Sequence, residues 1–185
     1  MTTADHGTLR IPPHPQITGD GLHLREWTDD DLPALSELFD EPQVDRWTPL
    51  RSPFDLTAAR KYLDKAFRAR AEDRGLHLAI TTDGRIPLGE VLLFQTGGGP
   101  DEAEVGYAVG AAHRRRGLAR RAVTLLTGYA HRSLGMRRVV LRIDPANAAS
   151  VAVAHSAGFA LTDEPPVTRE AEGRTVSLRT WCHQR

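Results

Sequence analysis

Apolar and polar positions along the chain repeat with two periods, one typical of strands and one typical of helices. Alternating or short apolar runs predict strands over residues 22–27, 76–81, 86–94, 103–109, 139–143, 159–162 and 176–181. Apolar residues three or four positions apart predict helices over residues 32–39, 56–72, 118–130 and 147–157. Helices alternate with strands in the middle of the chain, whereas strands follow one another elsewhere. This order predicts an α/β fold with a mixed sheet covered by helices.

Helix caps and loop residues mark the borders of these elements. Residues 28–31, Thr-Asp-Asp-Asp, are typical of a helix N-terminus, because short polar side chains accept hydrogen bonds from free backbone N–H groups. Gly135 is well placed to end the helix that begins at residue 118. Residues 42–53 begin and end with proline, carry Trp47, and are predicted to form a loop.

The first 19 residues differ from the rest of the chain. They are polar, contain Pro12, Pro13 and Pro15, and lack the apolar core of a signal peptide. We therefore expect residues 1–19 to form a flexible or loosely docked tail, and residues 20–185 to form a single domain. No apolar run approaches the roughly 18 residues of a membrane-spanning helix, so no membrane association is expected.

Charged residues are unevenly distributed although the formal net charge is zero. Residues 26–45 contain eight aspartates and glutamates and no lysine or arginine, whereas residues 113–142 are rich in arginine. This separation suggests one site for an anion and another for a cation. The simpler alternative is that the acidic stretch is a solvated helix face with an N-terminal cap.

Cysteine and histidine usage excludes several kinds of chemistry. The single cysteine, Cys182, rules out an internal disulfide and suits a reducing cytoplasm. We expect it to be half-buried near the end of the last strand. The eight histidines show no metal-ligand spacing, so no metal is predicted. The chain also lacks a Gly-x-Ser-x-Gly motif, which argues against a covalent acyl-enzyme.

Residues 113–119, His-Arg-Arg-Arg-Gly-Leu-Ala, join a predicted strand to a predicted helix. A helix N-terminus offers backbone N–H groups without intrahelical partners and the positive end of the helix dipole. Gly117 and Ala119 are small enough to let a phosphate approach these groups, and the arginines add charge. The junction is therefore predicted to hold a pyrophosphate. The alternative, a basic nucleic-acid patch, is disfavoured by the zero net charge and by the few aromatic residues nearby.

Three segments resemble the GNAT superfamily of acyl-CoA-dependent N-acyltransferases. Arg114-x-x-Gly117-x-Ala119 is similar to the (Gln/Arg)-x-x-Gly-x-(Gly/Ala) signature of that family, and residues 103–109 resemble its fourth strand. Asn147-x-x-Ser150, followed by Ala-Gly-Phe at residues 157–159, resembles its Asn-x-x-Ser…Gly-Phe segment.

The order and spacing of these segments agree with that family over residues 20–182. The branch that the chain resembles most is the ribosomal-protein-alanine N-acetyltransferase type, to which residues 24–28 and 47–53 are similar. The resemblance implies a mixed, mostly antiparallel sheet with a splayed central strand pair, flanked by helices.

The resemblance implies acetyl-CoA as the acyl donor. Its pyrophosphate would bind the backbone N–H groups of Arg115, Arg116, Gly117, Leu118 and Ala119. The side chains of Arg114 to Arg116 would contact the 3′-phosphate or remain solvated. The Val109 N–H would polarise the thioester carbonyl. Asn147 would bind the pantetheine amide, unless it serves only as a helix cap.

Catalytic groups also follow from the resemblance. An attacking amine must lose a proton before it is nucleophilic. Glu104 is the first candidate for this base, and Glu90, which we also assign to acceptor binding, is the second; either is alternatively an exposed strand carboxylate. Ser150 is the candidate acid for the departing thiolate. Many family members carry a tyrosine acid four residues before the Gly-Phe pair, where this chain has Ala154.

The acceptor site is defined least by the sequence. The resemblance places Trp47 and Asp45, in the 42–53 loop, on one wall and residues 164–172 on the other. Acidic side chains beside an aromatic ring suit a cationic amine, which favours an amine-bearing small molecule, a lysine or a protein N-terminus. Trp47 is alternatively a core residue. No nucleic-acid partner is expected, and edge strands of this fold permit a homodimer.

One main prediction and two alternatives result. The main prediction is a cytoplasmic N-acetyltransferase that transfers acetyl directly from acetyl-CoA to a primary amine. A non-catalytic acyl-CoA-binding or sensing module on the same fold would also combine an intact phosphate site with a missing tyrosine acid. A nucleic-acid-binding domain that uses the arginines of residues 113–142 is the third reading.

Overall fold

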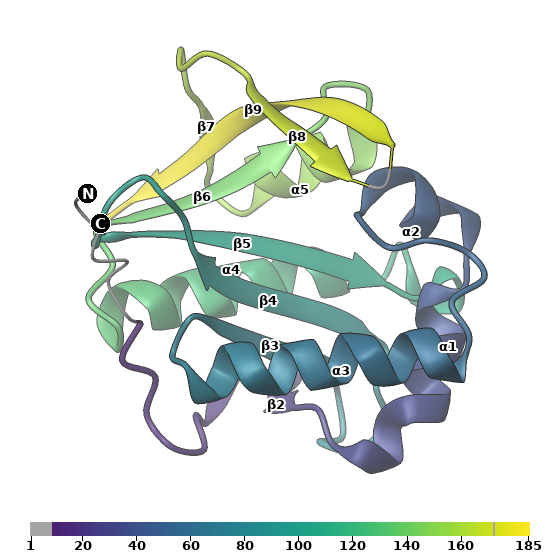
Figure 1. The fold of residues 1–185 in the computed structure, drawn as a ribbon. Coiled ribbons are helices and arrows are strands. Elements are labelled where there is room, and N and C mark those ends of the chain that lie inside the picture. The colour runs from purple at the N-terminus through teal and green to yellow at the C-terminus, as the bar shows by residue number, and fades with distance from the viewer. Residues whose placement is uncertain (1–8, 172) are drawn as a thin grey trace, which may run out of the picture.

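The computed structural model describes residues 9–171 and 173–185, which form one large sheet with helices on both faces (Figure 1). The strands follow the order β1-β2-β3-β4-β5-β6-β9-β7, and β8 pairs separately with β9. Their bounds are β1 Ile17–Gly19, β2 Leu22–Glu26, β3 Gly75–Thr81, β4 Gly89–Gln95, β5 Glu102–Val109, β6 Arg138–Ile143, β7 Ala160–Leu161, β8 Val167–Ala171 and β9 Arg174–Gln184.

The strand pair β5–β6 is parallel, whereas the other pairs of described strands are antiparallel. β5 pairs with β4 from Ala103 to Val109, but it pairs with β6 only over Glu102–Glu104. Figure 1 shows the two strands diverging beyond that point. The predicted mixed, mostly antiparallel sheet with a splayed central pair is therefore confirmed.

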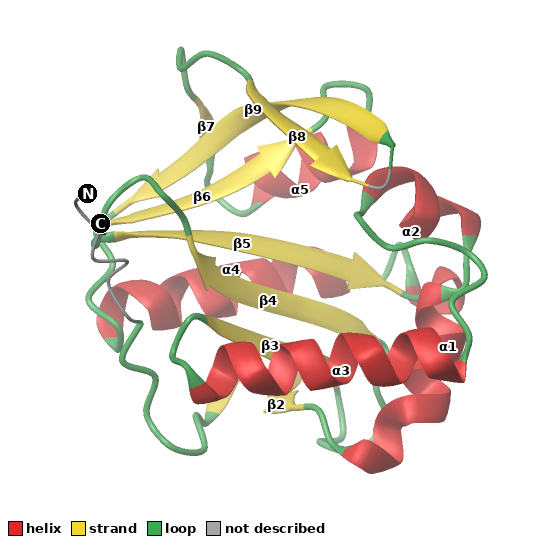
Figure 2. Cartoon of the chain, in the orientation of Figure 1, coloured by secondary structure: helices red, strands yellow, loops and turns green. Residues whose placement is uncertain are grey.

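Helices α1 and α3 cover one face of the sheet, and α4 and α5 cover the other (Figure 2). The helices are α1 Leu32–Phe39, α2 Pro42–Trp47, α3 Leu56–Ala71, α4 Leu118–Arg132 and α5 Ala148–Ser156, with 3-10 turns at Asp29–Asp31 and Ala111–His113. Each face has its own core, because side chains alternate across a strand. The α4 side includes Val91, Val105, Leu126 and Leu141, and the α3 side includes Trp27, Leu63 and Ala79.

Helix α4 shows how the sequence pattern becomes packing. Leu118, Ala122, Leu126 and Ala130 recur every four residues, and all four are buried against the sheet. Each fully buried leucine contributes about 1.5–3 kcal/mol relative to an exposed one. The apolar stripe thus holds the start of α4 firmly against the end of β5.

The loop predicted for residues 42–53 is wrong in its first half, where Pro42–Trp47 forms helix α2. Proline is compatible with the first helical position, because its missing N–H has no intrahelical partner there. The Glu41 side chain caps this helix by accepting a hydrogen bond from the Gln43 N–H at 3.0 Å. Val44 is buried and anchors the helix.

The N-terminal segment is also more ordered than predicted. Residues 1–8 of the expected tail lie outside the described residues, but Leu9 and Ile11 are buried, and Ile17–Gly19 forms β1 against β2. Leu9, Ile11 and Ile17 of the expected tail are therefore part of the core, whereas most residues between them are exposed. β8 was not predicted, since residues 167–171 lack a run of apolar positions. Among the described residues, no helix combines the length and the apolar character that crossing a membrane requires.

Candidate functional site

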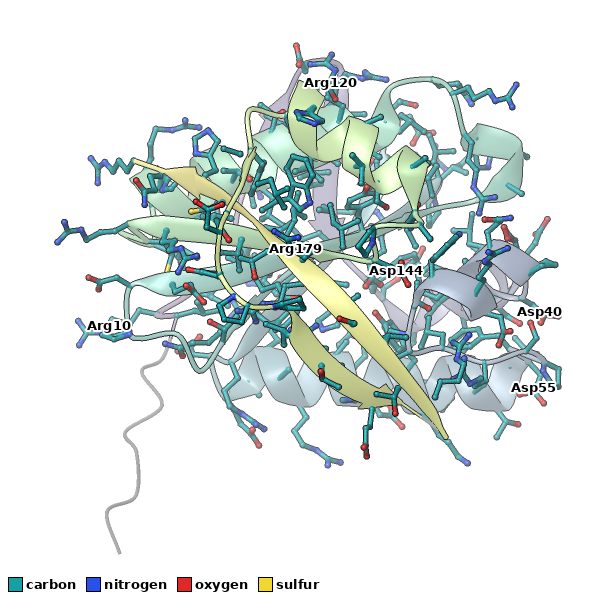
Figure 3. The ribbon with its side chains drawn as sticks, turned by 90° about the horizontal axis from the view of Figure 1, so that it is seen from above. Arg10, Asp40, Asp55, Arg120, Asp144 and Arg179 are labelled. Atoms are coloured by element: carbon teal, nitrogen blue, oxygen red, sulfur yellow. The ribbon has the colours of Figure 1, made fainter. Side chains whose placement is uncertain are left out.

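The β5–α4 junction presents a row of backbone N–H groups without intrahelical partners. Arg115 and Gly117 both have left-handed backbone conformations, with φ of 61° and 70°. The first intrahelical hydrogen bond of α4 runs from the Arg121 N–H to the Gly117 carbonyl at 3.1 Å. The N–H groups of residues 118–120 therefore lack intrahelical acceptors, as expected for a helix start. Arg120, in this first turn, is exposed at the edge of the molecule (Figure 3). Free N–H groups of this kind can bind an anion.

Glycine is favoured at position 117 by conformation rather than by space. A Cβ atom there would come no closer than 3.9 Å to Arg121 Nε, which is ordinary contact. A side chain in the left-handed region costs roughly 1–2 kcal/mol. The predicted phosphate site thus has a backbone shape that its own sequence maintains.

The three arginines of the junction have different roles. Arg114 makes two structural hydrogen bonds: its Nε donates to the Val109 carbonyl at 3.1 Å and its Nη2 donates to Glu41 at 2.5 Å. Arg115 and Arg116 are exposed, and Arg116 Nη1 lies 3.5 Å from His113 Nδ1. Arg114 therefore ties the end of β5 to α2, which leaves Arg115 and Arg116 for contact with an anion.

The divergence of β5 from β6 leaves backbone groups of β5 without a neighbouring strand. The Gly110 N–H donates to the Leu88 carbonyl at 3.0 Å. Because these directions alternate along an antiparallel pair, the N–H groups of Tyr107 and Val109 point away from β4, toward β6. β6 does not pair at this level. An extended ligand could satisfy these groups in place of a strand.

β4 and β5 approach each other closely at the same level. A Cβ atom on Gly89 would lie 2.4 Å from the Ala108 carbonyl oxygen, which no side chain could tolerate. The glycine therefore keeps β4 pressed against the end of β5. The strand gap opens only on the β6 side.

Helix α5 begins at Ala148, shortly after the end of β6, the strand that parts from β5. The Asn147 Oδ1 accepts a hydrogen bond from the Ser150 N–H at 3.1 Å, so the cap predicted for Asn147 is present. Because the Oδ1 atom is used in this cap, a ligand would have to accept a hydrogen bond from the Asn147 Nδ2 group. Ala154 is fully buried and supplies no hydroxyl.

Tyr107 lies on the same side as α5. Burial raises the pKa of its phenol to about 12, and the nearby Ser150 hydroxyl opposes that rise. The Tyr107 hydroxyl is buried and has no hydrogen-bond partner within the described residues. The sequence analysis treated Tyr107 only as a strand residue.

Glu104 is held in a buried ion-pair network. Its residue is 4% exposed, and Arg169 contacts both carboxylate oxygens, at 2.8 and 2.5 Å. Arg142 Nη1 donates to the same carboxylate at 3.1 Å. Three of the roughly four lone-pair sites of this carboxylate therefore accept hydrogen bonds from two guanidinium groups. These contacts argue against the role of first-choice base that we predicted for Glu104, and Glu104 is not an exposed strand carboxylate.

Glu90 is the acceptor of a second buried cluster, on the α3 side of the sheet. The Trp27 Nε1 donates to Glu90 at 3.0 Å and the Tyr62 hydroxyl donates to it at 2.5 Å. His77 Nδ1 lies 3.2 Å from the same carboxylate. Burial, followed by the Glu90 charge, raises the pKa of Tyr62 well above its usual value.

Sequence reasoning missed His77 and Tyr62. The signal was a histidine inside the apolar run Leu-His-Leu-Ala-Ile of residues 76–80. A polar residue at a buried strand position normally needs a partner. Its partners are 15 and 13 residues away in sequence, and no spacing rule connects them.

Helix α2 forms one side of the open end of β5, as Figure 1 shows. Trp47 is only partly buried, and its Nε1 donates to Gln43 Oε1 at 2.8 Å. The Arg46 guanidinium lies 4.6 Å from the centroid of the Trp47 ring. Trp47 is therefore not a core residue, but one of its faces already holds a cation. Arg174 Nη2 donates to the Asp45 carbonyl at 2.6 Å and so links α2 to β9.

The second predicted wall, residues 164–172, is only partly placed as expected. Arg169 of β8 reaches Glu104 and thus belongs to the site. Glu164 pairs with Arg138 at 2.6 Å, at the start of β6 and away from α2. Glu172 lies outside the described residues.

The acidic stretch of residues 26–45 is mostly used in structural contacts. Burial disfavours ionisation of Asp31, but hydrogen bonds from Arg25 and Thr28 outweigh it and lower the pKa of this carboxyl. Asp40 accepts from the Phe54 N–H at 2.9 Å, and Figure 3 shows Asp40 and Asp55 at one edge of the molecule. Further pairs join Glu26 to Arg70, Asp29 to Arg60 and Glu41 to Arg114. These contacts favour the simpler alternative of a capped, paired surface over a cation site.

Cys182 is half-buried in β9, as predicted, and its Sγ accepts a hydrogen bond from Arg138 Nε at 3.3 Å. Within residues 9–171 and 173–185, no group of three or more histidine, cysteine, aspartate or glutamate side chains is arranged to hold a metal ion.

Comparison with known proteins agrees with this geometry. A family described as "Acetyltransferase (GNAT) domain" matches residues 21–160. The chain is 24% identical over 161 residues to an uncharacterised N-acetyltransferase, p20, of Bacillus licheniformis, covering 85% of this chain and 89% of that protein.

Solved structures share the fold. RimJ of Mycobacterium smegmatis, in complex with CoA-disulfide, superposes with a TM-score of 0.77 at 20% identity, covering 88% of this chain and 81% of that one. The ribosomal-protein-S5-alanine acetyltransferase of Vibrio fischeri superposes with a TM-score of 0.75 at 16% identity, covering 92% and 96%.

Proposed function

Because the chain belongs to the GNAT acetyltransferase family, we propose that this enzyme transfers an acetyl group from acetyl-CoA directly to a primary amine. The observation that carries the proposal is the pairing of two features at one place. The left-handed turn at Arg115 and Gly117 and the free N–H groups of residues 118–120 follow the end of β5, where β5 has parted from β6. The first suits a pyrophosphate and the second suits an extended pantetheine arm.

Each predicted donor contact has a physical basis in the chain. Backbone N–H groups from Arg115 to Ala119 would bind the pyrophosphate, with Arg115 and Arg116 near the phosphates. The N–H groups of Val109 and Tyr107 would face the pantetheine and the thioester carbonyl, and donors aimed at that oxygen stabilise its developing charge. The Asn147 Nδ2 would bind a pantetheine amide. Arg114 would act by bracing Val109 rather than by touching the donor.

We assign deprotonation of the amine to the Glu90 cluster rather than to Glu104. The side chain of His77 is 17% exposed, whereas that of Glu90 is 1% exposed, so His77 is the member that water or an amine can reach. A proton taken up at His77 Nε2 would be stabilised by Glu90 at Nδ1, as in other carboxylate–histidine pairs. Glu104 would instead hold Arg169 and Arg142, and with them the β8–β9 hairpin, against β5.

For the acceptor, the fold neighbours suggest a protein N-terminus, since one of them is named for the alanine of a ribosomal protein. Small amines remain the second class. The site lies between α2 and the β8–β9 hairpin, which Arg174 joins. A reducing cytoplasm suits the single cysteine and the availability of acetyl-CoA.

Calorimetry and a release assay test the proposal. Titration with acetyl-CoA and with desulfo-CoA should show binding of both, since the cradle contacts phosphate and pantetheine rather than sulfur. Amines should then stimulate release of CoA, measured with a thiol reagent across peptide N-termini, lysine and polyamines. Binding without stimulated release by any amine would favour a non-catalytic CoA-binding module. Salt-sensitive DNA binding with no CoA affinity would favour the nucleic-acid alternative.

A further inference from the structure

Two guanidinium groups lie at the C-terminal end of helix α2. Arg174 of β9 donates from Nη2 to the carbonyls of Asp45 and Thr48, at 2.6 and 3.3 Å, and from Nη1 to the Arg46 carbonyl at 3.4 Å. The Arg46 side chain is exposed, and its guanidinium stacks on the Trp47 ring. Neither guanidinium forms an ion pair with a carboxylate within residues 9–171 and 173–185. Carbonyl dipoles hold these two positive charges without neutralising them.

The carboxylate of the same helix is already engaged. Asp45 Oδ1 lies 3.6 Å from Arg51 Nη1 and accepts from the Ser52 N–H at 3.3 Å. The sequence suggested that Asp45 and Trp47 would together bind a cationic amine. Here the carboxylate faces Arg51 and the ring faces Arg46, so these two residues are poorly suited to bind a further cation.

Charges along the neighbouring strands offset one another. Glu104 is shared by Arg169 and Arg142, and Arg142 also lies 3.7 Å from Glu102. Arg138 then joins Glu102 at 2.8 Å to Glu164 at 2.6 Å. This chain alternates guanidinium and carboxylate groups in equal number. The positive excess on this side of the sheet therefore comes from Arg46 and Arg174.

The register of the β8–β9 hairpin places Arg174 on the side of the acceptor. Arg169 pairs with Val176 and Ala171 pairs with Arg174, so these side chains share one face of the hairpin. Because Arg169 contacts Glu104 of β5, that face is turned toward β5. Glu170 alternates with Arg169 and is exposed on the opposite face.

Helix α2 also sets the distance between these charges and the reacting carbonyl. Its start is tied to the end of β5, because Glu41 accepts from Arg114, which donates to the Val109 carbonyl. Its other end is tied to Arg174. The six residues of α2 rise about 9 Å. An extended peptide advances about 3.4 Å per residue, so an acceptor with its amine near Val109 would bring its second or third residue toward Arg174.

We infer that the acceptor is a peptide N-terminus with a carboxylate side chain at its second or third residue, bound by Arg46 and Arg174. The inference rests on the acetyl transfer proposed above and names the acceptor class. Guanidinium groups suit a carboxylate because they present paired N–H donors to its two oxygens. The Arg46 guanidinium makes no hydrogen bond to the described residues and is free to donate. A lysine at the same peptide position would meet two like charges.

Amidated tripeptides test the acceptor class in the CoA-release assay. Ala-Glu-Ala should have a kcat/KM about tenfold or more above that of Ala-Gln-Ala, the effect typical of hydrogen bonds to a charged group, and Ala-Lys-Ala should fall below both. A longer neutral peptide with its only glutamate at the seventh position should behave like Ala-Gln-Ala. The preference for glutamate should shrink as salt is raised, because exposed charges are screened.

Arg46→Gln is the first variant, since this guanidinium joins no other element and its loss should leave the fold intact. It should lower the ratio of kcat/KM for Ala-Glu-Ala over Ala-Gln-Ala at least about threefold, mainly through KM. Arg46→Glu should raise kcat/KM for Ala-Lys-Ala above that for Ala-Glu-Ala. Arg174→Gln should lower the ratio too, with its melting temperature measured because Arg174 also ties α2 to β9. Arg137→Gln is the matched control: Arg137 is exposed just before β6, at the opposite end of the sheet from α2 (Figure 1), and the ratio should not change.

The inference and the proposed function fail in different ways. Equal kcat/KM for the glutamate and glutamine peptides, or a preference for Ala-Lys-Ala or spermidine, would overturn the inference and leave acetyl transfer intact. A ratio that Arg46→Gln and Arg174→Gln change no more than Arg137→Gln would do the same. Acetylation of free aspartate without acetylation of the peptides would overturn the peptide assignment. A wild type that releases CoA with no amine would overturn the proposed function together with the inference.

Discussion

Replacing Glu104 with glutamine separates an ion-pair role of this carboxylate from the role of a base. In the native protein both carboxylate oxygens accept from Arg169, and Arg142 donates to one of them. Glutamine keeps the length of the side chain but removes the charge and turns an N–H₂ group toward a guanidinium. The change therefore removes the counter-charge of two partly buried cations.

The cost in stability follows from the exposure of the partners. Breaking a buried ion pair from one side costs about 3–5 kcal/mol. The Arg169 side chain is 36% exposed and can turn to water, whereas the Arg142 side chain is 15% exposed and cannot do so as easily. We therefore expect Glu104→Gln to lower the free energy of unfolding by about 2 kcal/mol, less than the full value for a buried pair. For a chain of this length, that corresponds to a fall in Tm of roughly 4–8 °C.

The assay combines urea unfolding with amine-stimulated CoA release at a temperature where the variant is fully folded. We expect kcat to fall less than about tenfold, whereas removal of a general base costs about 10²–10⁴-fold. Glu90→Gln, in the same assay, should show the larger loss in kcat. The reasoning fails if Glu104→Gln loses more than a hundredfold in kcat with unchanged stability, because Glu104 would then be the base after all.

Two further predictions concern the cradle and a histidine pair. Gly117→Ala should weaken acetyl-CoA binding by about 5–30-fold in calorimetry, because relief of roughly 1–2 kcal/mol of backbone strain would displace the N–H row. Gly135→Ala is the control: Gly135 has nearly the same φ and open space around it, so this variant should bind acetyl-CoA normally. Burial and the charge of His131 lower the pKa of His183, so the unfolded chain takes up the proton more readily and stability should decline as pH falls from about 6.5 through the lowered pKa. In urea unfolding between pH 7 and 5, His183→Asn should reduce the fall in the free energy of unfolding, and the exposed control His14→Asn should not. Equal pH dependence of the free energy of unfolding in wild type and His183→Asn would count against the assignment.

The sequence by itself determined the elements that arise from local spacing. Period-two and helical patterns predict β2 to β6 and helices α1, α3, α4 and α5, because those periods follow directly from backbone geometry. The backbone shape of the proposed phosphate cradle was also readable, since it depends on a glycine and small residues only a few positions apart at a strand–helix junction. Helix α2 was missed because a proline-bounded stretch is equally typical of a loop.

Only the tertiary structure decided which side chains contact the two strand carboxylates, Glu104 and Glu90. Glu104 and Glu90 are both strand carboxylates, and the alternation of a strand says only which face each side chain occupies. Their partners come from residues 38 and 65 positions away for Glu104 and 13, 28 and 63 positions away for Glu90. Whether a buried carboxylate meets two guanidinium groups or a histidine depends on how the hairpin and the helices pack over the sheet, and that packing sums many weak contacts that no local pattern encodes.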